Sequence, residues 1–286
     1  APRDQARRSD VGAMIRAQSV TYVAGGRPLV RDIDLELQPG RLVAIIGPNG
    51  AGKSTLLRLL TGELKPTAGR VLIDSQDMAT LAADYLSRRR AVVSQHTPLT
   101  FPFTALEVVL LGISVPGLEV SNPGAHRLAQ NMLERLGLGH VAHQTYTTLS
   151  GGERQRVHLA RVLCQLESGR CPPNETAILA DEPTSSLDIG HQLLVLDELT
   201  RQKSSGRAVL AVLHDLNLAS AYADELVLIS DGTVLARGPA SEVMRDDRLS
   251  EAFGCEVRTN RVPQNGGPFL LPQSCAALSS GPGSYS

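Results

Sequence analysis

The hydrophobic positions of the chain follow two spacings, one typical of strands and one typical of helices. Residues 42–46, LVAII, form an unbroken apolar run, which is typical of a strand buried on both faces. A helix is indicated shortly afterwards by the spacing of Leu56, Leu57, Leu59 and Leu60. A buried strand is therefore followed closely by a helix.

The same two patterns predict alternating strands and helices along most of the chain. Strands are predicted at 15–23, 29–37, 42–46, 69–74, 91–94, 177–180, 208–213, 226–230 and 233–236. Helices are predicted around 56–60 and at 79–90, 105–111, 125–136, 151–166 and 191–202. Asp231-Gly232 is the two-residue signal of a β-hairpin. Because residues 96–165 show helical patterns without a strand, we predict an α/β core with a mostly helical lobe inserted into it.

Composition narrows the class of protein. Of 286 residues, 42% are hydrophobic, and the formal net charge is -1, so a large core can form and no basic field attracts nucleic acid. Four cysteines without a Cys-x-x-Cys pair provide no zinc or redox motif. The first ten residues lack an apolar signal region, and no run approaches the ~20 apolar residues of a membrane span. We expect a cytosolic chain that binds no nucleic acid and reaches a membrane only through a partner.

A glycine-rich stretch, GPNGAGKST, lies between the buried strand and the first helix. Glycines allow positive φ and close approach of the backbone to an anion, and the following helix start adds further N–H donors. Lys53, one of three lysines among 28 basic residues, can reach the outer phosphates, and the Ser54 hydroxyl can ligate Mg²⁺. The predicted phosphate-binding residues are Gly47, Pro48, Asn49, Gly50, Ala51, Gly52, Lys53, Ser54 and Thr55.

Two carboxylates follow a second apolar strand in the stretch AILADEPT. Asp181 at the strand end can hold Mg²⁺ through its water shell, and Glu182 can polarise an attacking water. Taken alone, the pair is as typical of a solvated turn as of a site. Next to a phosphate loop, it favours phosphoryl transfer, which needs placed charge and a placed water.

A second helix start of the same character occurs in LSGGERQR. Ser150 is a candidate N-cap, and Gly151 and Gly152 precede a helix whose apolar stripe includes Val157, Ala160 and Cys164. The residues by themselves leave two interpretations open, an anion-binding helix start and a capped helix with no ligand, and slightly favour the second.

The order GPNGAGKST, LSGG, ADEPTSSLD and a strand ending in His214 resembles the ATP-binding subunit of ABC transporters over about residues 13–250. The resemblance implies a P-loop NTPase core with an antiparallel β subdomain and the inserted helical subdomain at about 96–165. It leaves 251–286 as a C-terminal extension, partly flexible. In this family two subunits dimerise head-to-tail, and each ATP lies between the phosphate loop of one chain and the LSGG helix of the other.

The resemblance also implies roles for individual residues. Tyr22 would stack on adenine; the less favoured alternative is a half-buried strand tyrosine with no ligand. Gln95 would sense Mg²⁺ and the attacking water, Asp188 would lie between the two sites, and His214 would contact the γ-phosphate. In the same family pattern, Glu182 is the catalytic carboxylate, Ser150, Gly151 and Gly152 contact the partner's γ-phosphate, and Ser54, Gln95 and Asp181 serve Mg²⁺.

Longer stretches, including LSGGERQRVHLARVL and AVLHDLNLASAYADELVLISDG, look like the ATP-binding subunits of bacterial haem importers. These belong to the iron-chelate and vitamin B12 importer group. The resemblance implies integral-membrane permease subunits as partners, a periplasmic substrate-binding protein acting indirectly, and a peripheral place on the cytoplasmic face of the inner membrane. Three alternatives remain: a siderophore or vitamin B12 importer, a soluble non-transport ABC ATPase, and a module that switches without hydrolysis. The presence of Glu182 disfavours the last.

Overall fold

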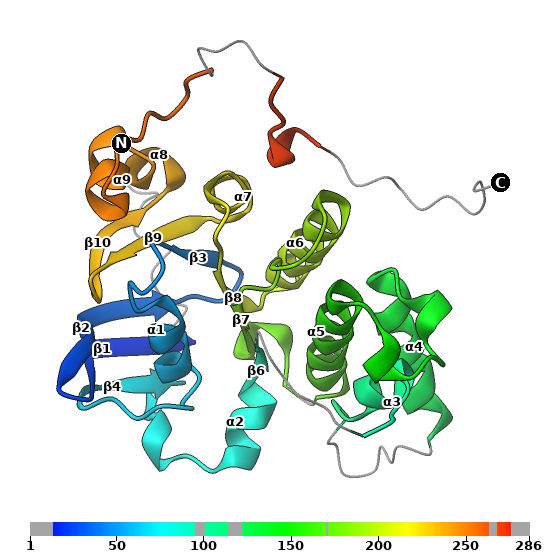
Figure 1. Cartoon of the computed structure of the whole chain (residues 1–286). Coiled ribbons are helices and arrows are strands. Elements are labelled where there is room, and N and C mark those ends of the chain that lie inside the picture. Colours follow the sequence, from blue (N-terminus) through cyan, green and yellow to red (C-terminus); the bar gives the residue numbers. More distant parts are fainter. Residues whose placement is uncertain (1–13, 95–100, 114–121, 170, 263–267, 276–286) are drawn as a thin grey trace, which may run out of the picture.

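The structure is a computed structural model that describes residues 14–94, 101–113, 122–169, 171–262 and 268–275. It contains two sheets and a group of helices set to one side of them (Figure 1). The predicted α/β class is confirmed.

The larger sheet has six strands in the order β10-β9-β3-β8-β7-β6. Its strands are β3 (Leu42–Ile46), β6 (Arg90–Val93), β7 (Ala177–Asp181), β8 (Ala208–Val212), β9 (Glu225–Ser230) and β10 (Thr233–Gly238). All neighbours are parallel except β10, which forms the predicted hairpin with β9. The carboxyl ends of β3, β8 and β7 therefore meet at one edge of the sheet, where ligands of open α/β sheets bind.

The smaller sheet is antiparallel and has the order β2-β1-β4-β5. Its strands are β1 (Ile15–Ala24), β2 (Arg27–Leu37), β4 (Ala68–Ile73) and the short β5 (Gln76–Asp77). It lies beside α1 in Figure 1, on the opposite side of the molecule from α3 and α4. This sheet corresponds to the antiparallel β subdomain that the family resemblance implies.

Nine helices occur in the described part of the chain. They are α1 (Lys53–Leu60), α2 (Ala83–Arg89), α3 (Ala105–Leu110), α4 (Pro123–Arg135), α5 (Gly151–Ser168), α6 (Ile189–Ser204), α7 (Leu216–Tyr222), α8 (Ala240–Val243) and α9 (Asp246–Phe253). Between β6 and β7 the described elements are α3, α4, α5 and short 3-10 turns, and the three helices pack on one another. The exact limits of the inserted lobe and of the C-terminal extension remain predictions.

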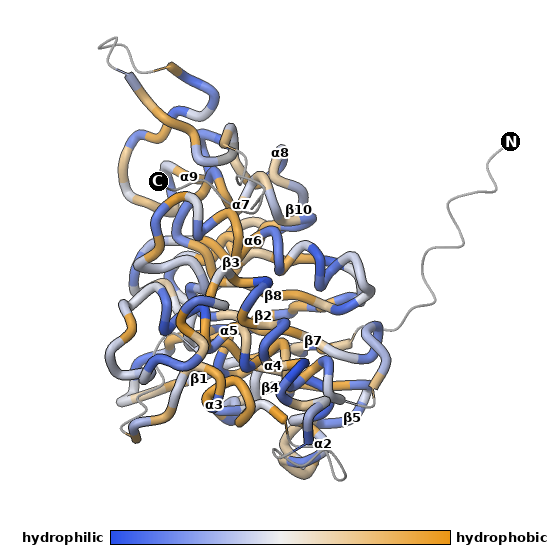
Figure 2. Tube along the Cα trace, turned by 90° about the vertical axis from the view of Figure 1, so that its right-hand side faces the viewer, coloured by the Kyte–Doolittle hydropathy of each residue, from blue (hydrophilic) through white to orange (hydrophobic). Residues whose placement is uncertain are grey.

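Buried side chains form two clusters, one on each face of the six-stranded sheet. Leu42, Ala44 and Ile46 of β3 belong to the cluster shared with α3 to α6, while Val43 and Ile45 face the cluster shared with α1 and the small sheet. All five are at most 1% exposed, which explains why their segment is apolar throughout. In Figure 2, hydrophobic stretches run through the central strands as well as through other parts of the trace.

The structure differs from the sequence prediction in several short elements. The predicted helix at 79–90 is wrong at its start, because Met78–Thr80 is a 3-10 turn and α2 begins at Ala83. Neither α7 nor α9 was predicted, since seven- and eight-residue helices show too few turns of periodicity. The predicted flexible tail lies largely in residues 276–286, outside the described residues.

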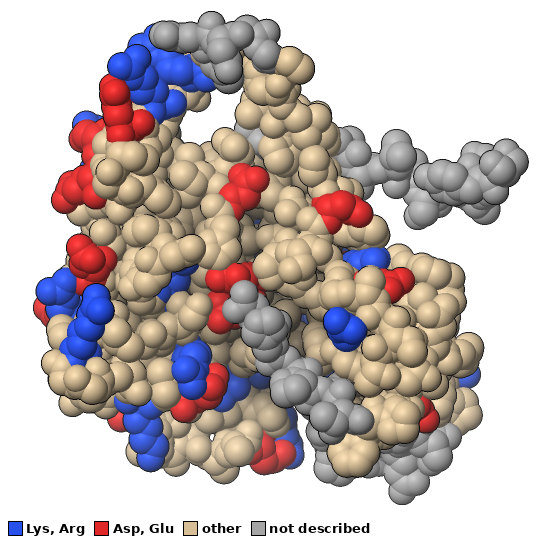
Figure 3. Space-filling view, in the orientation of Figure 1, with Lys and Arg blue, Asp and Glu red and all other residues tan. Residues whose placement is uncertain are grey.

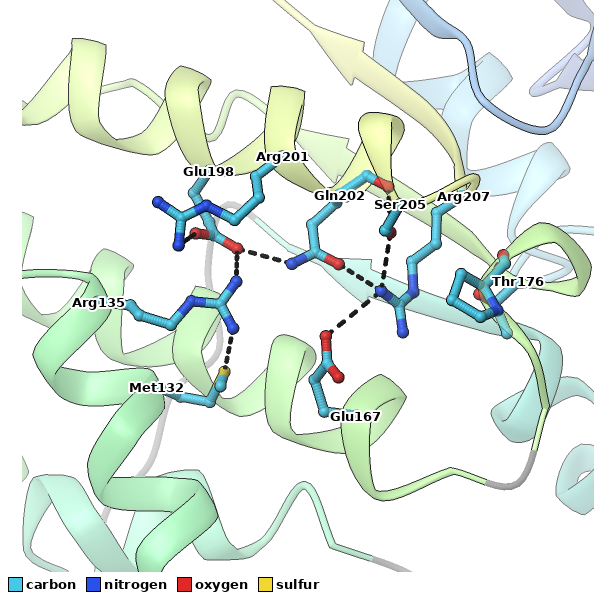
Figure 4. Close-up of polar contacts among 10 residues, drawn as sticks. Met132, Arg135, Glu167, Thr176, Glu198, Arg201, Gln202, Ser205 and Arg207 are labelled. Atoms are coloured by element: carbon cyan, nitrogen blue, oxygen red, sulfur yellow. Dashed lines mark hydrogen bonds and ion pairs between the residues drawn. The ribbon is translucent and has the colours of Figure 1, made fainter.

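A buried polar network joins the helical lobe to the core (Figure 4). Arg135, at the end of α4, pairs with Glu198 of α6, whose side chain is 2% exposed. Gln202 donates to Glu198 (Nε2 to Oε1, 2.7 Å) and accepts from Arg207 (Nη1 to Oε1, 2.7 Å). Arg207 also lies 3.4 Å from a carboxylate oxygen of Glu167 on α5. Side chains from three helices and from the residue preceding β8 thus neutralise one another in the interior.

The surface carries charges of both signs. On the face seen in Figure 3, acidic and basic side chains are interspersed among uncharged ones rather than gathered into separate fields. Among the described residues, no helix combines the length and apolar character that crossing a membrane requires.

Candidate active site

The predicted phosphate loop connects β3 to α1, at the edge where the parallel strands end. Gly47 has φ 144°, and a Cβ there would lie 2.1 Å from the carbonyl oxygen of Ile229. Gly52 has φ 100°, and a Cβ there would lie 2.4 Å from the carbonyl oxygen of Leu29. Backbone packs against backbone at both positions, so a larger residue would displace the loop.

Lys53 is buried at the base of this loop, with 5% of the residue exposed. Its Nζ donates to the carbonyl oxygens of Gly47 (2.8 Å) and Pro48 (2.7 Å). Burial lowers the pKa of Lys53, and the nearby carboxylates of Glu182 and Asp181 act in the opposite direction. The ammonium group is thus held in place within a partly desolvated pocket.

The start of α1 is built to receive an anion. Its N-cap, Gly52, makes no side-chain capping hydrogen bond. The amides of Lys53, Ser54 and Thr55 lie in the first turn, where a helix supplies no internal acceptor. These donors and the positive end of the helix dipole favour a bound phosphate group.

Ser54, in the first turn of α1, meets Asp181, the last residue of β7. Ser54 Oγ donates to Asp181 Oδ1 over 3.1 Å. Burial raises the pKa of Asp181, whereas the Ser54 hydrogen bond lowers it. A hydroxyl and a carboxylate are oxygen ligands that suit Mg²⁺. Within the described ranges no group of three or more His, Cys, Asp or Glu side chains could hold a metal ion.

Glu182 and His214 come together from the ends of β7 and β8. His214 Nε2 lies 2.5 Å from Glu182 Oε1, with side-chain exposures of 44% and 14%. Glu182 also lines a pocket of about 310 Å³ together with residues of the phosphate loop and α1. The lining residues are Leu29, Asn49, Gly50, Gly52, Lys53, Ser54, Thr55 and Glu182. Glu182 therefore borders the same space as the phosphate-loop residues and Lys53.

A larger cavity, about 770 Å³, is lined by parts of α1, β4, α2, β6 and α5. It contains none of the residues of the phosphate loop or the carboxylate pair. We therefore place the chemistry in the smaller pocket, where the charged groups and the open helix start converge.

The second predicted anion site lies apart from this pocket. Ser150 caps α5, and its amide and hydroxyl both donate to Glu153 Oε2 (2.8 Å each), completing a capping box. Gly151, the first residue of α5, is exposed. Ser150, Gly151 and Gly152 are not among the described residues that line the pocket. The structure of one chain thus contains two anion-ready helix starts that do not share a cavity.

The remaining predicted residues fall in different surroundings. Asp188 caps α6 by accepting from the main-chain amide of His191 (2.9 Å), and its carboxylate also contacts the His191 ring (2.8 Å). Tyr22 on β1 is half-buried and packs against the hydrophobic cluster shared by α1 and the small sheet. It is not among the described residues that line the pocket. Gln95 lies outside the described residues.

One residue at the site was missed by sequence reasoning. Gln155 of α5 donates through Nε2 to the carbonyl oxygen of Glu182 (2.8 Å) and contacts Ser185 Oγ (3.3 Å). Its place one helical turn after Gly152 is a signal that it shares that face of α5. Nothing in the sequence pattern indicates that this face of α5 packs against the turn that contains Glu182.

The ABC transporter family matches residues 30–185, more than half of the chain. The chain belongs to the ABC transporter family. It is an ATP-binding and ATP-hydrolysing subunit of this type, as the sequence resemblance implied.

Relatives of this ABC subunit extend over nearly its whole length. It is 42% identical over 261 residues to the hemin import ATP-binding protein HmuV of Rhizobium meliloti, which covers 91% of this chain and 99% of that protein. It is 43% identical over 270 residues to the protein of the same name from Bradyrhizobium diazoefficiens, covering 94% and 98%.

Solved structures show the same ABC fold. A metal-chelate type ABC transporter in an inward-facing conformation has a TM-score of 0.70 and 26% identity, covering 85% of this chain and 90% of that one. A dimeric bacterial ABC transporter cassette has a TM-score of 0.70 and 31% identity, covering 79% and 99%. A dimeric cassette bound to ADP and phosphate after hydrolysis has a TM-score of 0.69 and 30% identity.

Proposed function

We propose that this chain is the ATP-hydrolysing subunit of a haem importer. The observation that carries the proposal is the 42–43% identity to two hemin import ATP-binding proteins over 98–99% of their lengths. The metal-chelate type transporter among the structural neighbours supports the same class of cargo.

Nucleotide binding is assigned to the phosphate loop and α1. The loop amides and the start of α1 would cradle the phosphates, while Lys53 adds a positive charge at the β- and γ-phosphates. Tyr22 is proposed to stack on the adenine ring, which requires the half-buried ring to offer one face to the nucleotide. Asp181 and Ser54 would hold Mg²⁺, together with Gln95, and the ion would supply positive charge to the phosphates.

Hydrolysis is assigned to Glu182 and His214. A water attacks the γ-phosphorus, its proton passes to the Glu182 carboxylate, and the bond to the ADP oxygen breaks. His214, 2.5 Å from Glu182, would contact the γ-phosphate. Glu182 faces the pocket that Lys53 also lines, which supports this division of roles.

The functional unit is proposed to be a head-to-tail homodimer. One chain keeps its two anion-ready helix starts in separate places, and the related cassette is dimeric. Each nucleotide would then lie between the phosphate loop of one chain and Ser150, Gly151 and Gly152 of the other, with Asp188 between the two sites. ATP stabilises the closed dimer, and hydrolysis removes that stabilisation, so the dimer opens.

The dimer is proposed to act on integral-membrane permease subunits from the cytoplasmic face of the inner membrane. A periplasmic substrate-binding protein would deliver haem to the other face. Phe101 and Leu111, which are 65% and 50% exposed, flank α3 and are candidates for permease contact. The rest of α3 is mostly buried, which limits the docking surface to its ends.

Reconstitution with the permease tests the cargo. Haem-loaded binding protein should accelerate ATP hydrolysis by the assembled transporter, whereas binding protein loaded with a ferric siderophore or vitamin B12 should not. Acceleration by the siderophore and not by haem would reject haem as the cargo while leaving the ABC importer assignment intact.

Fractionation tests the soluble, non-transport alternative. The chain should sediment with membranes only when the permease is present. Sedimentation with ribosomes, whether or not the permease is expressed, would contradict a transport role.

A further inference from the structure

Glu182 has an unusual backbone for the residue that bears the proposed catalytic carboxylate. Its φ is 50°, in the left-handed region that residues other than glycine rarely occupy. Such a conformation is less stable than the ordinary one and persists only when neighbouring groups enforce it. The direction in which the carboxylate leaves the backbone depends on this conformation.

Three donors converge on the carbonyl oxygen of Glu182. The Ser185 amide (3.1 Å) and the Ser185 hydroxyl (3.0 Å) come from the same turn. The third donor is Nε2 of Gln155, at 2.8 Å, which comes from α5. Gln155 therefore attaches the strained turn to a long helix, whereas Ser185 belongs to the turn itself.

The first two turns of α5 also pack on the rest of that turn. A Cβ added to Gly152 would lie 2.9 Å from Cδ2 of Leu187, so the helix start and the turn touch. The charges of Arg156 and Asp188 interact across the same boundary. The helix start proposed to contact the partner's nucleotide and the turn that carries the proposed base form one packed unit.

We propose that Gln155 is a positioning residue for hydrolysis. Its hydrogen bond holds the Glu182 main chain, and so the carboxylate, in the orientation that activates water. The same bond ties the Glu182 of one nucleotide site to the LSGG helix that serves the other site. This inference rests on the proposed function, because it takes Glu182 as the base.

Gln165 provides a matched control on the same helix. Its Nε2 donates to the main-chain carbonyl oxygens of Ser87 (2.6 Å) and Arg90 (3.4 Å), in a half-buried position like that of Gln155. Gln165→Leu and Gln155→Leu each remove an amide donor to a main-chain carbonyl. They differ in that only Gln155 contacts the Glu182 turn.

The experiment compares steady-state ATP hydrolysis of the full-length chain. Gln155→Leu should lower kcat by at least about tenfold, because small misplacements of a catalytic group cost this much, and should leave the KM for ATP within about twofold. Gln165→Leu should change neither value by more than about twofold. A normal kcat for Gln155→Leu, or an equal fall for both variants, would overturn the proposal.

Ser185→Ala supplies a second variant that removes a donor to the same carbonyl. Because Ser185 and Gln155 act through one oxygen, the loss of kcat in the double variant should be smaller than the product of the two single losses. Independent losses that multiply would contradict a shared role at Glu182.

Trapping the dimer separates this inference from the proposed function. Glu182→Gln should lose turnover and retain an ATP-bound dimer, and adding Gln155→Leu should leave that dimer intact. If the added change abolishes the dimer, Gln155 acts on nucleotide binding and the inference fails. If Glu182→Gln itself keeps normal turnover, the proposed base is wrong and the failure belongs to the proposed function.

Discussion

Two clusters of charged side chains in this protein are built from similar residues and are placed differently. At the pocket, Lys53 faces Asp181 and Glu182. In the interior, Arg135 pairs with Glu198, while Arg207 contacts Gln202 and Glu167. Burial lowers the pKa of both Lys53 and Arg207, so desolvation alone does not distinguish a reactive site from a structural one.

The difference lies in what the charges face. In the interior network the charged and amide groups pair mainly with one another (Figure 4). The Nε atoms of Arg135 and Arg207 are buried without a hydrogen-bond partner. The charges at the pocket face about 310 Å³ of open volume next to a helix start whose amides need acceptors. A cluster that leaves donors and charge pointing into a cavity is organised for a ligand, whereas a self-paired cluster stabilises the packing of helices.

The largest expected effect is on the interior network. Glu198→Ala removes the buried carboxylate with which the half-buried Arg135 pairs, and should lower the free energy of unfolding by about 3–5 kcal/mol. Denaturant titration at neutral pH measures this loss. Replacing Arg135 and Glu198 together by Met should restore most of the stability, because no charge is then left unpaired. A rise in the KM for ATP in still-folded Glu198→Ala would show that the two clusters are not separate.

Lys53→Met should affect ATP binding rather than folding stability, which is the opposite of the effect expected for Glu198→Ala. Removing the charge at the phosphates should weaken ATP binding by about 100-fold, near 2.7 kcal/mol, as expected for a charged hydrogen-bonding group. Folding stability should change little, because relief of the desolvated ammonium offsets the loss of its hydrogen bonds to the Gly47 and Pro48 carbonyls. Calorimetric titration with ATP and thermal melting measure the two properties. Unchanged ATP affinity would contradict the assignment of the pocket.

Asp181→Asn tests whether the buried Asp181 carboxylate lowers the folding stability of the chain while it supports hydrolysis. Burial raises the pKa of Asp181, so its ionised form is less favourable in the folded than in the unfolded chain. At neutral pH without nucleotide, the variant should melt a few degrees higher, an effect limited by partial solvent screening, and should lose hydrolysis. The gain should shrink as the pH falls through the raised pKa of folded Asp181, because the folded chain takes up this proton before the unfolded chain does. A lower melting temperature would argue that the carboxylate is structural.

The smallest effect concerns the cap of α5. The Ser150 hydroxyl, followed by the Ser150 amide, lowers the pKa of Glu153. Glu153→Ala should therefore cost about 0.5–1 kcal/mol at neutral pH. This loss should vanish as the pH falls through the lowered folded pKa, since Glu153 stabilises the fold only when ionised.

The matched capping box at Thr104 and Glu107 of α3 provides the control. Glu107→Ala should show a pH-dependent stability loss of the same sign, because Thr104 lowers the pKa of Glu107. It should leave ATP-dependent dimerisation of the Glu182→Gln chain unchanged, while Glu153→Ala should weaken it. Equal effects on the dimer would remove the distinction between the two caps.

Much of the fold follows from local patterns in the chain. The apolar run 42–46 is a strand buried on both faces, Asp231-Gly232 turns a hairpin, and the helical stretch from Gly151 ends two residues beyond its predicted limit. These elements are predictable because burial and turn geometry act over a few neighbouring residues. The roles of the individual site residues stay predictions, although the phosphate loop and Glu182 do lie around one pocket.

Other features depend on the approach of segments far apart in the chain. Gln155 reaches the Glu182 carbonyl, His214 reaches the Glu182 carboxylate, and Glu198 meets Arg135 only because parallel strands and packed helices bring them together. The residue types along the chain determine which groups are available to bind phosphate or carry a proton. The tertiary packing decides which of those groups share a cavity. Groups far apart in the chain act together only when the fold holds them within a few ångströms of one another, because the entropy of bringing them together must be offset by packing.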